Sequence, residues 1–139
     1  MTRFAVDAPV LLRLAREEAV VGADHQLVGP GSLRSDVLPL LLRAVRAGDL
    51  SDGEALVLLD RVAGIRMRLL GDRVSRRVAW RIAVDLDLAD TRLAEHVAVA
   101  TLQADVLVTE DPVLVRAAQG RVRTAGWPEL ARASSLGAS

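Results

Sequence analysis

The sequence contains no cysteine, lysine, asparagine or tyrosine among its 139 residues, and several of these absences remove a class of chemistry. Without cysteine the chain cannot form disulfides, use a thiolate nucleophile or bind zinc through thiolates. Without lysine it cannot perform a reaction that requires an essential lysine. The 18 basic side chains are therefore all arginine, and carboxylates and two histidines remain as candidate reactive groups.

Long apolar runs and net charge are also missing. No stretch approaches the roughly 18 apolar residues of a membrane helix, and no export signal precedes the first carboxylate, so we expect a soluble, cytoplasmic protein with no membrane partner. The formal net charge is zero, so the whole molecule has no long-range attraction to polyanions. The length predicts one domain, which we place at residues 1–133, followed by a frayed tail at residues 134–139.

Charge is nevertheless segregated along the chain. Between residues 61 and 81, seven arginines face a single acid, Asp72. Two interpretations remain open for this stretch: a solvated helix face with ordinary ion pairs, or a surface that binds RNA or a protein partner. We expect the two tryptophans, Trp80 and Trp127, to be packing residues.

Apolar runs that end in an acid indicate buried parallel strands. The run at residues 4–6 ends at Asp7, and the run at residues 105–109 ends at Glu110 and Asp111. Weaker patterns predict a brief strand at residues 26–28, a strand with edge character at 65–70 and a short edge strand at 120–124.

Helical spacing of apolar residues fills the intervals between these strands. Pro39 falls inside the helix predicted from residue 33, where it should bend the axis. Ser51 and Glu54 form a capping box that opens the next helix. Further helices are predicted at residues 72–86, from Asp90 and from Pro112. Strands separated by helices need crossover connections, so we predict an α/β fold: a three-layer α/β/α sandwich with a mostly parallel central sheet.

Acids that follow parallel strands point to a common site, because ligands bind beyond the carboxyl ends of such strands. Asp7 and Asp111 occupy this position, and Asp36 lies at the start of a helix. Each alone could be an ordinary helix cap or surface acid. Two carboxylates about 4 Å apart repel by roughly 4 kcal/mol at an effective dielectric near 20. Mg²⁺ or Mn²⁺ would turn this repulsion into coordination and support phosphodiester hydrolysis.

Three segments of the sequence resemble the PIN-domain ribonucleases, and most closely the VapC-like toxins of high-GC bacteria: residues 4–8, 33–38 and 104–111. The resemblance implies a PIN-like fold and a Mg²⁺- or Mn²⁺-dependent endoribonuclease that hydrolyses RNA. It also implies the toxin of a toxin–antitoxin pair, which forms a homodimer and is held inactive by an antitoxin protein.

The resemblance assigns metal binding and catalysis to Asp7, Asp36 and Asp111, with Thr109 assisting from the strand end. The third acid of the family falls on Leu93 in this sequence. Asp90, three residues earlier, is the candidate substitute for that acid, because a regular helix would put it one turn away on the same face. The alternative role for Asp90 is that of a helix N-cap. The alternative is a catalytically degenerate PIN-like binding or regulatory protein.

Other candidate chemistries are less well supported by the sequence. His25 and His96 lack the spacing of a zinc-protease motif or a catalytic triad, so we expect both to be structural or exposed. Response-regulator receivers and haloacid-dehalogenase-like phosphatases also gather acids at strand ends, but each normally needs a lysine, which this sequence lacks.

Overall fold

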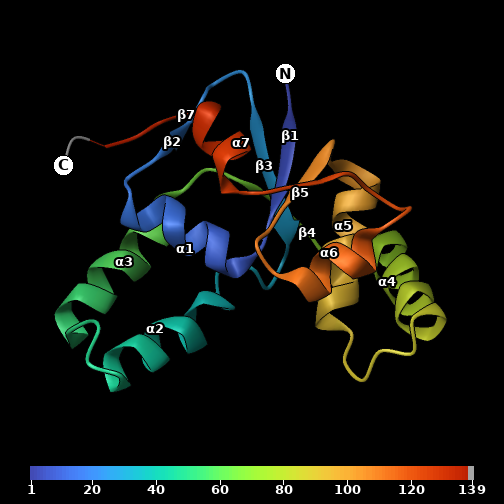
Figure 1. The fold of residues 1–139 in the computed structure, drawn as a ribbon, viewed down its shortest axis with the longest axis horizontal. Helices are drawn as coiled ribbons and strands as arrows, with labels where there is room; N and C mark the ends of the chain where they lie inside the picture. The colour runs from blue at the N-terminus through green and yellow to red at the C-terminus, as the bar shows by residue number, and fades with distance from the viewer. Residues whose placement is uncertain (138–139) are drawn as a thin grey trace.

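A five-stranded parallel sheet lies at the centre of the computed structural model, which describes residues 1–137 (Figure 1). The strands lie in the order β4-β3-β1-β5-β6, and each neighbouring pair is parallel. Their bounds are β1 Arg3–Val6, β3 Gln26–Pro30, β4 Arg68–Leu70, β5 Val106–Val108 and β6 Thr124–Ala125. The interior position of β1 and β5 in the sheet explains the apolar runs at residues 4–6 and 106–108.

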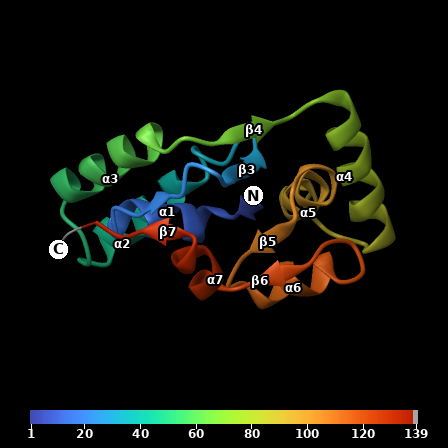
Figure 2. The ribbon, with the colours of Figure 1, turned by 90° about the horizontal axis from the view of Figure 1, so that it is seen from above.

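Helices cover both faces of the sheet (Figure 2). Phe4 and Val6 of β1 point into one core, shared with α1, α2, α3 and α7, whereas Ala5 points into a second core, shared with α4, α5 and α6. The helix bounds are α1 Ala8–Arg16, α2 Val37–Arg46, α3 Asp52–Gly64, α4 Arg73–Asp85, α5 Arg92–Gln103, α6 Pro112–Ala118 and α7 Trp127–Arg132. The predicted three-layer α/β/α sandwich is therefore confirmed.

The register of β1 and β5 fixes the carboxyl edge of the sheet. Val6 pairs with Val108, so the next residues, Asp7 and Thr109, emerge side by side. The predicted strands at the sheet edges are shorter than expected. β4 begins at Arg68, and β6 begins at Thr124, where the predicted strand ended. No helix within residues 1–137 combines the length and the apolarity needed to span a bilayer.

The start of α2 differs from the prediction. The chain forms turns from Leu33 to Asp36, with the Leu33 amide donating to the Pro30 carbonyl, and the helix begins only at Val37. Pro39 therefore lies in the first helical turn, where a backbone N–H has no partner within the helix. The predicted bend at Pro39 loses its physical cause.

The predicted frayed tail is wrong for residues 134–137. Ser134–Ser135 forms β7, which pairs antiparallel with β2 (Val20–Val21), and the Gly137 amide donates to the Glu17 carbonyl at 3.1 Å. Backbone hydrogen bonds hold this segment, so its small polar side chains gave no signal of order. The remaining predicted tail residues, 138–139, lie outside the described part of the chain.

Candidate functional site

Asp7 is a buried carboxylate at the carboxyl end of β1, with 6% of the residue exposed. Its Oδ1 accepts a hydrogen bond from the Val10 amide at 3.0 Å, which caps α1. Its Oδ2 accepts a hydrogen bond from the Thr109 hydroxyl at 2.5 Å. The capping interpretation is thus true of one carboxylate oxygen, while the other faces the neighbouring strand end.

Thr109 links the two acids that follow β1 and β5. Its Oγ1 donates to Asp7 and accepts a hydrogen bond from the Asp111 amide at 3.0 Å. Asp111 in turn caps α6, because its Oδ1 accepts from the Val113 amide at 2.9 Å. The second carboxylate oxygen of Asp111 makes no hydrogen bond within residues 1–137 and lies at an exposed position. The predicted supporting position of Thr109 at the strand end therefore has a defined geometry.

The pKa of Asp7 is raised above its ordinary value, chiefly because burial penalises the charged carboxylate. The hydrogen bonds from Thr109 and Val10 oppose this rise, as does the nearby His96. The negative charge of Asp111 raises the pKa of Asp7 further. Asp7 and Asp111 are therefore close enough to repel each other, as expected for two acids that share one site.

Asp36 has its side chain available, although it occupies the N-cap position of α2. Its backbone is already helical and its carboxylate makes no capping hydrogen bond. Oδ2 instead accepts a hydrogen bond from the Ser32 hydroxyl at 3.1 Å and lies 4.0 Å from Nε2 of His96. The carboxylate of Asp36 therefore does not cap α2.

His96 lies beside two of the predicted site acids, Asp7 and Asp36, although its sequence context predicted only a structural or exposed residue. Its side chain is 13% exposed, and its Nδ1 is buried without a hydrogen-bond partner within residues 1–137. Burial lowers the pKa of His96, whereas the charges of Asp7, Asp36 and Glu95 oppose the shift. The imidazole is therefore neutral at pH 7, the form that binds metals and accepts protons.

A sequence signal for His96 does exist. His96 lies three positions after Leu93, so both lie on the same side of α5. Leu93 itself is half-buried and packs against the core on the α4–α6 side of the sheet. The helix face on which the resemblance puts a third acid therefore offers an imidazole one turn later.

Asp90 does not belong to this helix face. α5 begins at Arg92, so Asp90 precedes the helix instead of continuing its surface. Its Oδ1 accepts from the Arg92 amide at 2.8 Å, and its Oδ2 lies 3.6 Å from Nε of the same arginine. The expectation that Asp90 stands one helical turn from Leu93 is wrong, because Asp90 lies before the first residue of α5 and is not part of the helix.

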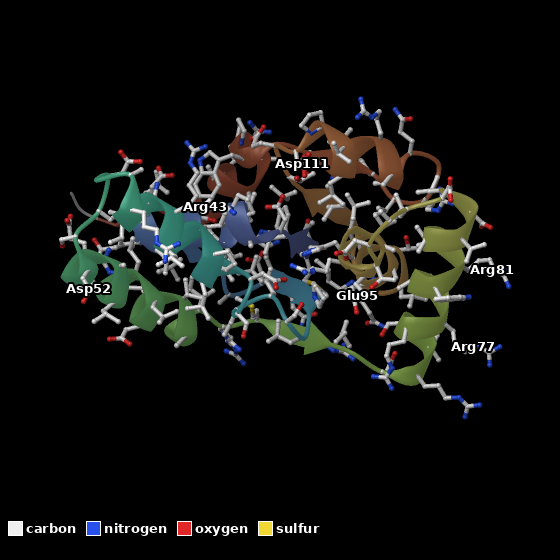
Figure 3. All side chains as sticks on the ribbon, turned by 90° about the horizontal axis from the view of Figure 1, so that it is seen from below. Arg43, Asp52, Arg77, Arg81, Glu95 and Asp111 are labelled. Carbon is white, nitrogen blue, oxygen red and sulfur yellow. The ribbon has the colours of Figure 1, made fainter. Side chains whose placement is uncertain are left out.

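Asp7, Asp111, Asp36 and His96 lie near one another at the carboxyl edge of the sheet, and we call these four residues the acidic cluster. Figure 3 looks onto this edge, where Asp111 is labelled. The carboxylate oxygens suit Mg²⁺ or Mn²⁺, and a cation would relieve the repulsion between Asp7 and Asp111. Within residues 1–137, however, no three acidic or histidine side chains already stand in an arrangement that could hold a metal ion. The donor chemistry fits a divalent cation, and the side chains must move closer to bind it.

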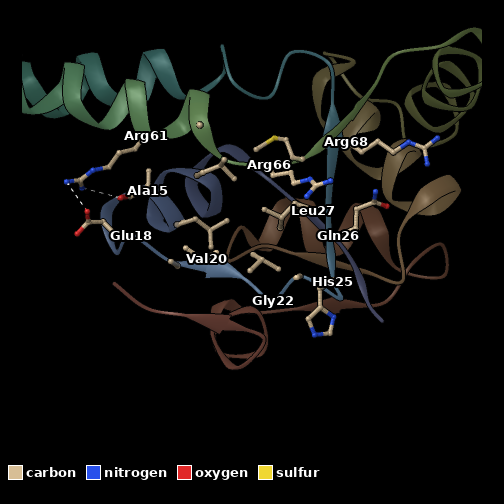
Figure 4. Close-up of a pocket in the computed structure, with 17 residues that line it drawn as sticks. Ala15, Glu18, Val20, Gly22, His25, Gln26, Leu27, Arg61, Arg66 and Arg68 are labelled. Carbon is tan, nitrogen blue, oxygen red and sulfur yellow. Dashed lines mark hydrogen bonds and ion pairs between the residues drawn. The ribbon is translucent and has the colours of Figure 1, made fainter. Parts of the chain in front are cut away.

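A hollow of about 830 Å³ lies away from the acidic cluster, at the amino ends of β3 and β4 (Figure 4). Its only lining acid among the described residues, Glu18, forms an ion pair with Arg61 at 3.4 Å. No aspartate lines this hollow within residues 1–137. This hollow is therefore distinct from the acidic cluster.

Comparison with known proteins supports the fold. No protein-family model matches the chain, and no curated protein matches it in sequence. The solved structure of PAE2754 from Pyrobaculum aerophilum is similar to it, with a TM-score of 0.68 and 22% sequence identity over 94% of this chain and 95% of that one. At this identity the similarity establishes a shared architecture over nearly the whole length of both chains.

Proposed function

We propose that this protein is a Mg²⁺- or Mn²⁺-dependent endoribonuclease that hydrolyses RNA phosphodiester bonds. The observation that supports the proposal most directly is the hydrogen-bonded connection from Asp7 through Thr109 to Asp111, across the ends of two adjacent parallel strands. Asp36 and His96 lie beside these residues and complete the acidic cluster. Acids gathered at this edge of an α/β sheet suit a phosphoryl-transfer site.

In the proposed site, Asp7, Asp111 and Asp36 hold the cation, and Thr109 orients the carboxylate of Asp7. A bound Mg²⁺ or Mn²⁺ would activate water and neutralise charge that develops on the phosphate. The burial of Asp7 limits its hydration, which strengthens its interaction with a cation. Neutral His96 can accept a proton or a hydrogen bond beside Asp36.

The proposed partners are an RNA substrate, a second copy of the chain in a homodimer and an antitoxin protein, in a cytoplasmic setting. Exposed apolar side chains on α2 and α3 support a protein partner. Leu38 and Leu42 lie one helical turn apart on α2 and are 48% and 50% exposed, and Leu56 and Val57 of α3 are 56% and 50% exposed.

A catalytically degenerate binding or regulatory protein is the second candidate function. Two observations favour it: Leu93 stands where the resemblance puts an acid, and no three-donor group within residues 1–137 is ready to hold a metal. The two candidate functions differ in whether the acidic cluster binds a metal ion and whether the protein cleaves RNA.

Calorimetric titration with Mn²⁺ tests the metal site. We expect heat of binding with the unaltered protein and with Asp52→Asn, a matched change of a surface acid on α3, and none with Asp7→Asn. The absence of heat with the unaltered protein would favour the degenerate alternative.

Cleavage of a labelled RNA tests the activity, with Asp111→Asn as the inactive variant. Asp111→Asn keeps the oxygen that caps α6 but removes the negative charge. Cleavage by the unaltered protein and not by the variant supports the proposal. Equal cleavage by both would mean that the activity arises at another site.

A further inference from the structure

One face of α4 is basic from Arg73 to Arg81. Arg73, Arg76, Arg77, Trp80 and Arg81 are spaced at i, i+3, i+4, i+7 and i+8, which puts them on one side of the helix. We call these five residues the α4 stripe. The opposite side of α4, with Ala79, Ile82 and Ala83, is buried in the core that the helix shares with α5. The stripe therefore faces away from the core, and Figure 3 shows Arg77 and Arg81 projecting outward from α4.

The arginines of the α4 stripe are not neutralised by ion pairs. Within residues 1–137, none of the four approaches a carboxylate closely enough to form one. Arg76 donates instead to the Gly71 carbonyl at 2.6 Å. The nearby acid Asp72 is used to cap α4 through the Ser75 amide. Of the two interpretations left open by the sequence, ordinary ion pairing does not describe these side chains.

Trp80 is exposed in the middle of the stripe. The prediction that it packs in the interior is wrong, since 64% of the residue is accessible, whereas Trp127 is 6% exposed and fulfils the same prediction. An exposed indole among arginines offers a flat surface on which a nucleobase can stack. The helical spacing puts Trp80 between Arg77 and Arg81, so a stacked base would have cations on both sides for its phosphates.

Two hollows lie along the surface between the stripe and Ser32, a neighbour of the acidic cluster. The first, of about 480 Å³, is lined by all five stripe residues. The second, of about 190 Å³, lies at the carboxyl ends of β3 and β4 and is lined by Arg76, Glu95 and Ser32, among others. Ser32 donates its hydroxyl to Asp36. Arg76 is thus shared by both hollows, and the second hollow reaches Ser32, which contacts Asp36 of the acidic cluster.

We propose that the α4 stripe binds single-stranded RNA and directs it toward the acidic cluster. The arginines contact the phosphates, and one base stacks on Trp80. The choice of RNA as the occupant rests on the proposed function. Single strands are favoured over duplexes because only unpaired bases can leave their neighbours to stack on an indole. Among the described residues, Glu95 is the acid that lines the second hollow, where the strand would pass from the arginines to the proposed cation site.

Binding in EDTA tests the stripe without cleavage. Fluorescence anisotropy of a labelled 12-residue oligouridine measures affinity, and quenching of tryptophan emission reports contact with Trp80. We expect Trp80→Ala to weaken binding about fivefold or more, while Trp80→Phe retains most of the affinity and loses the quenching. Arg77→Ala and Arg81→Ala should each lower the slope of log affinity against log salt by about 0.7. Arg132→Ala on α7 is the matched control and should change neither quantity.

Several outcomes would overturn the proposal that the α4 stripe binds single-stranded RNA. One is equal RNA binding by the unaltered protein and by the Arg77→Ala, Arg81→Ala double variant. Another is tighter binding of a 12-base-pair duplex than of the single strand. A poly-glutamate peptide is the competing probe: binding of this peptide without binding of RNA would assign the stripe to an acidic protein partner.

Failure of this inference can be separated from failure of the proposed function. Cleavage in Mn²⁺ by a protein whose stripe variants bind RNA normally would leave the nuclease intact and reject the stripe. Stripe-dependent RNA binding without cleavage in Mn²⁺ would reject the nuclease and retain the stripe. The two measurements use the same full chain, in EDTA for binding and in Mn²⁺ for cleavage.

Discussion

The Thr109 hydroxyl donates to the Asp7 carboxylate over 2.5 Å, and this contact joins residues 102 positions apart in the sequence. Both side chains are buried, so water cannot replace either partner without a rearrangement. The same hydroxyl accepts from the Asp111 amide. Removing one oxygen atom should therefore disturb both strand ends at once.

Thr109→Val is expected to destabilise the protein by about 1–3 kcal/mol, because it leaves a buried carboxylate oxygen and an amide without their partner at nearly constant side-chain volume. Thr109→Ser keeps the hydroxyl and should recover most of this loss. Urea denaturation of the three proteins at pH 7 measures the effect. Equal stability of the valine and serine variants would show that the hydroxyl contributes little.

Asp7→Asn should change how stability depends on pH. Because burial raises the pKa of Asp7, the folded protein keeps this proton at pH values where the unfolded chain, with a pKa near 3.8, has lost it. The contribution of Asp7 to stability is therefore full below pH 3.8 and lost as pH rises through the folded pKa, with a slope of at most about 1.4 kcal/mol per pH unit.

The difference in unfolding free energy between the unaltered protein and Asp7→Asn isolates this effect. Acids with lowered pKa, such as Asp72 and Glu129, act in the opposite direction but cancel in the difference. We expect the unaltered protein to lose stability relative to the variant between pH 3 and pH 7. A difference that stays flat with pH would contradict the raised pKa.

His96 should act on stability in a different pH range. Burial lowers its pKa, so below the unfolded value of 6.5 the unfolded chain takes up a proton that the folded protein does not bind. Stability from this group is thus present above pH 6.5 and lost as pH falls, again by at most about 1.4 kcal/mol per pH unit. Chemical denaturation from pH 7.5 to 5.5 should show a shallower decline for His96→Gln than for the unaltered protein. Parallel declines would mean that His96 ionises equally in both states.

Leu93→Asp should restore an acid to the helix face that also presents His96. We expect tighter Mn²⁺ binding by calorimetry than in the unaltered protein, because a further carboxylate adds an oxygen donor and a negative charge. Without metal, the same change should cost about 1–3 kcal/mol, since a half-buried apolar side chain is replaced by a polar one. Leu93→Asn is the control for lost packing and should not gain affinity. Equal Mn²⁺ affinity in the aspartate and asparagine variants would argue against metal binding at this face.

The sequence was sufficient to predict the layered fold and the adjacency of two strand ends. The runs that end at Asp7 and Asp111 are apolar because β1 and β5 lie at the centre of the sheet, so pattern and topology agree. The β2–β7 pair escaped prediction because backbone hydrogen bonds hold Ser134–Ser135, and their formation does not depend on apolar side chains.

The site was predicted less completely than the fold. His96 was expected to be structural or exposed because it lacks the spacing of a zinc-protease motif or a catalytic triad, and only tertiary packing brings it near Asp7 and Asp36. Asp90 was misplaced because a shift of two residues in the start of α5 moves a side chain off the helix face. Trp80 was expected inside because large aromatic residues usually bury area, whereas here it interrupts a row of arginines.

The pairing of β1 with β5 also bears on synthesis of the chain. A nascent polypeptide that has emerged from the ribosome only as far as α4 contains Asp7 and Asp36 but neither His96 nor the strand that brings Thr109 and Asp111. Contacts of such long sequence separation form late, after the intervening helices exist. The acidic cluster therefore cannot form until the last third of the chain has been translated.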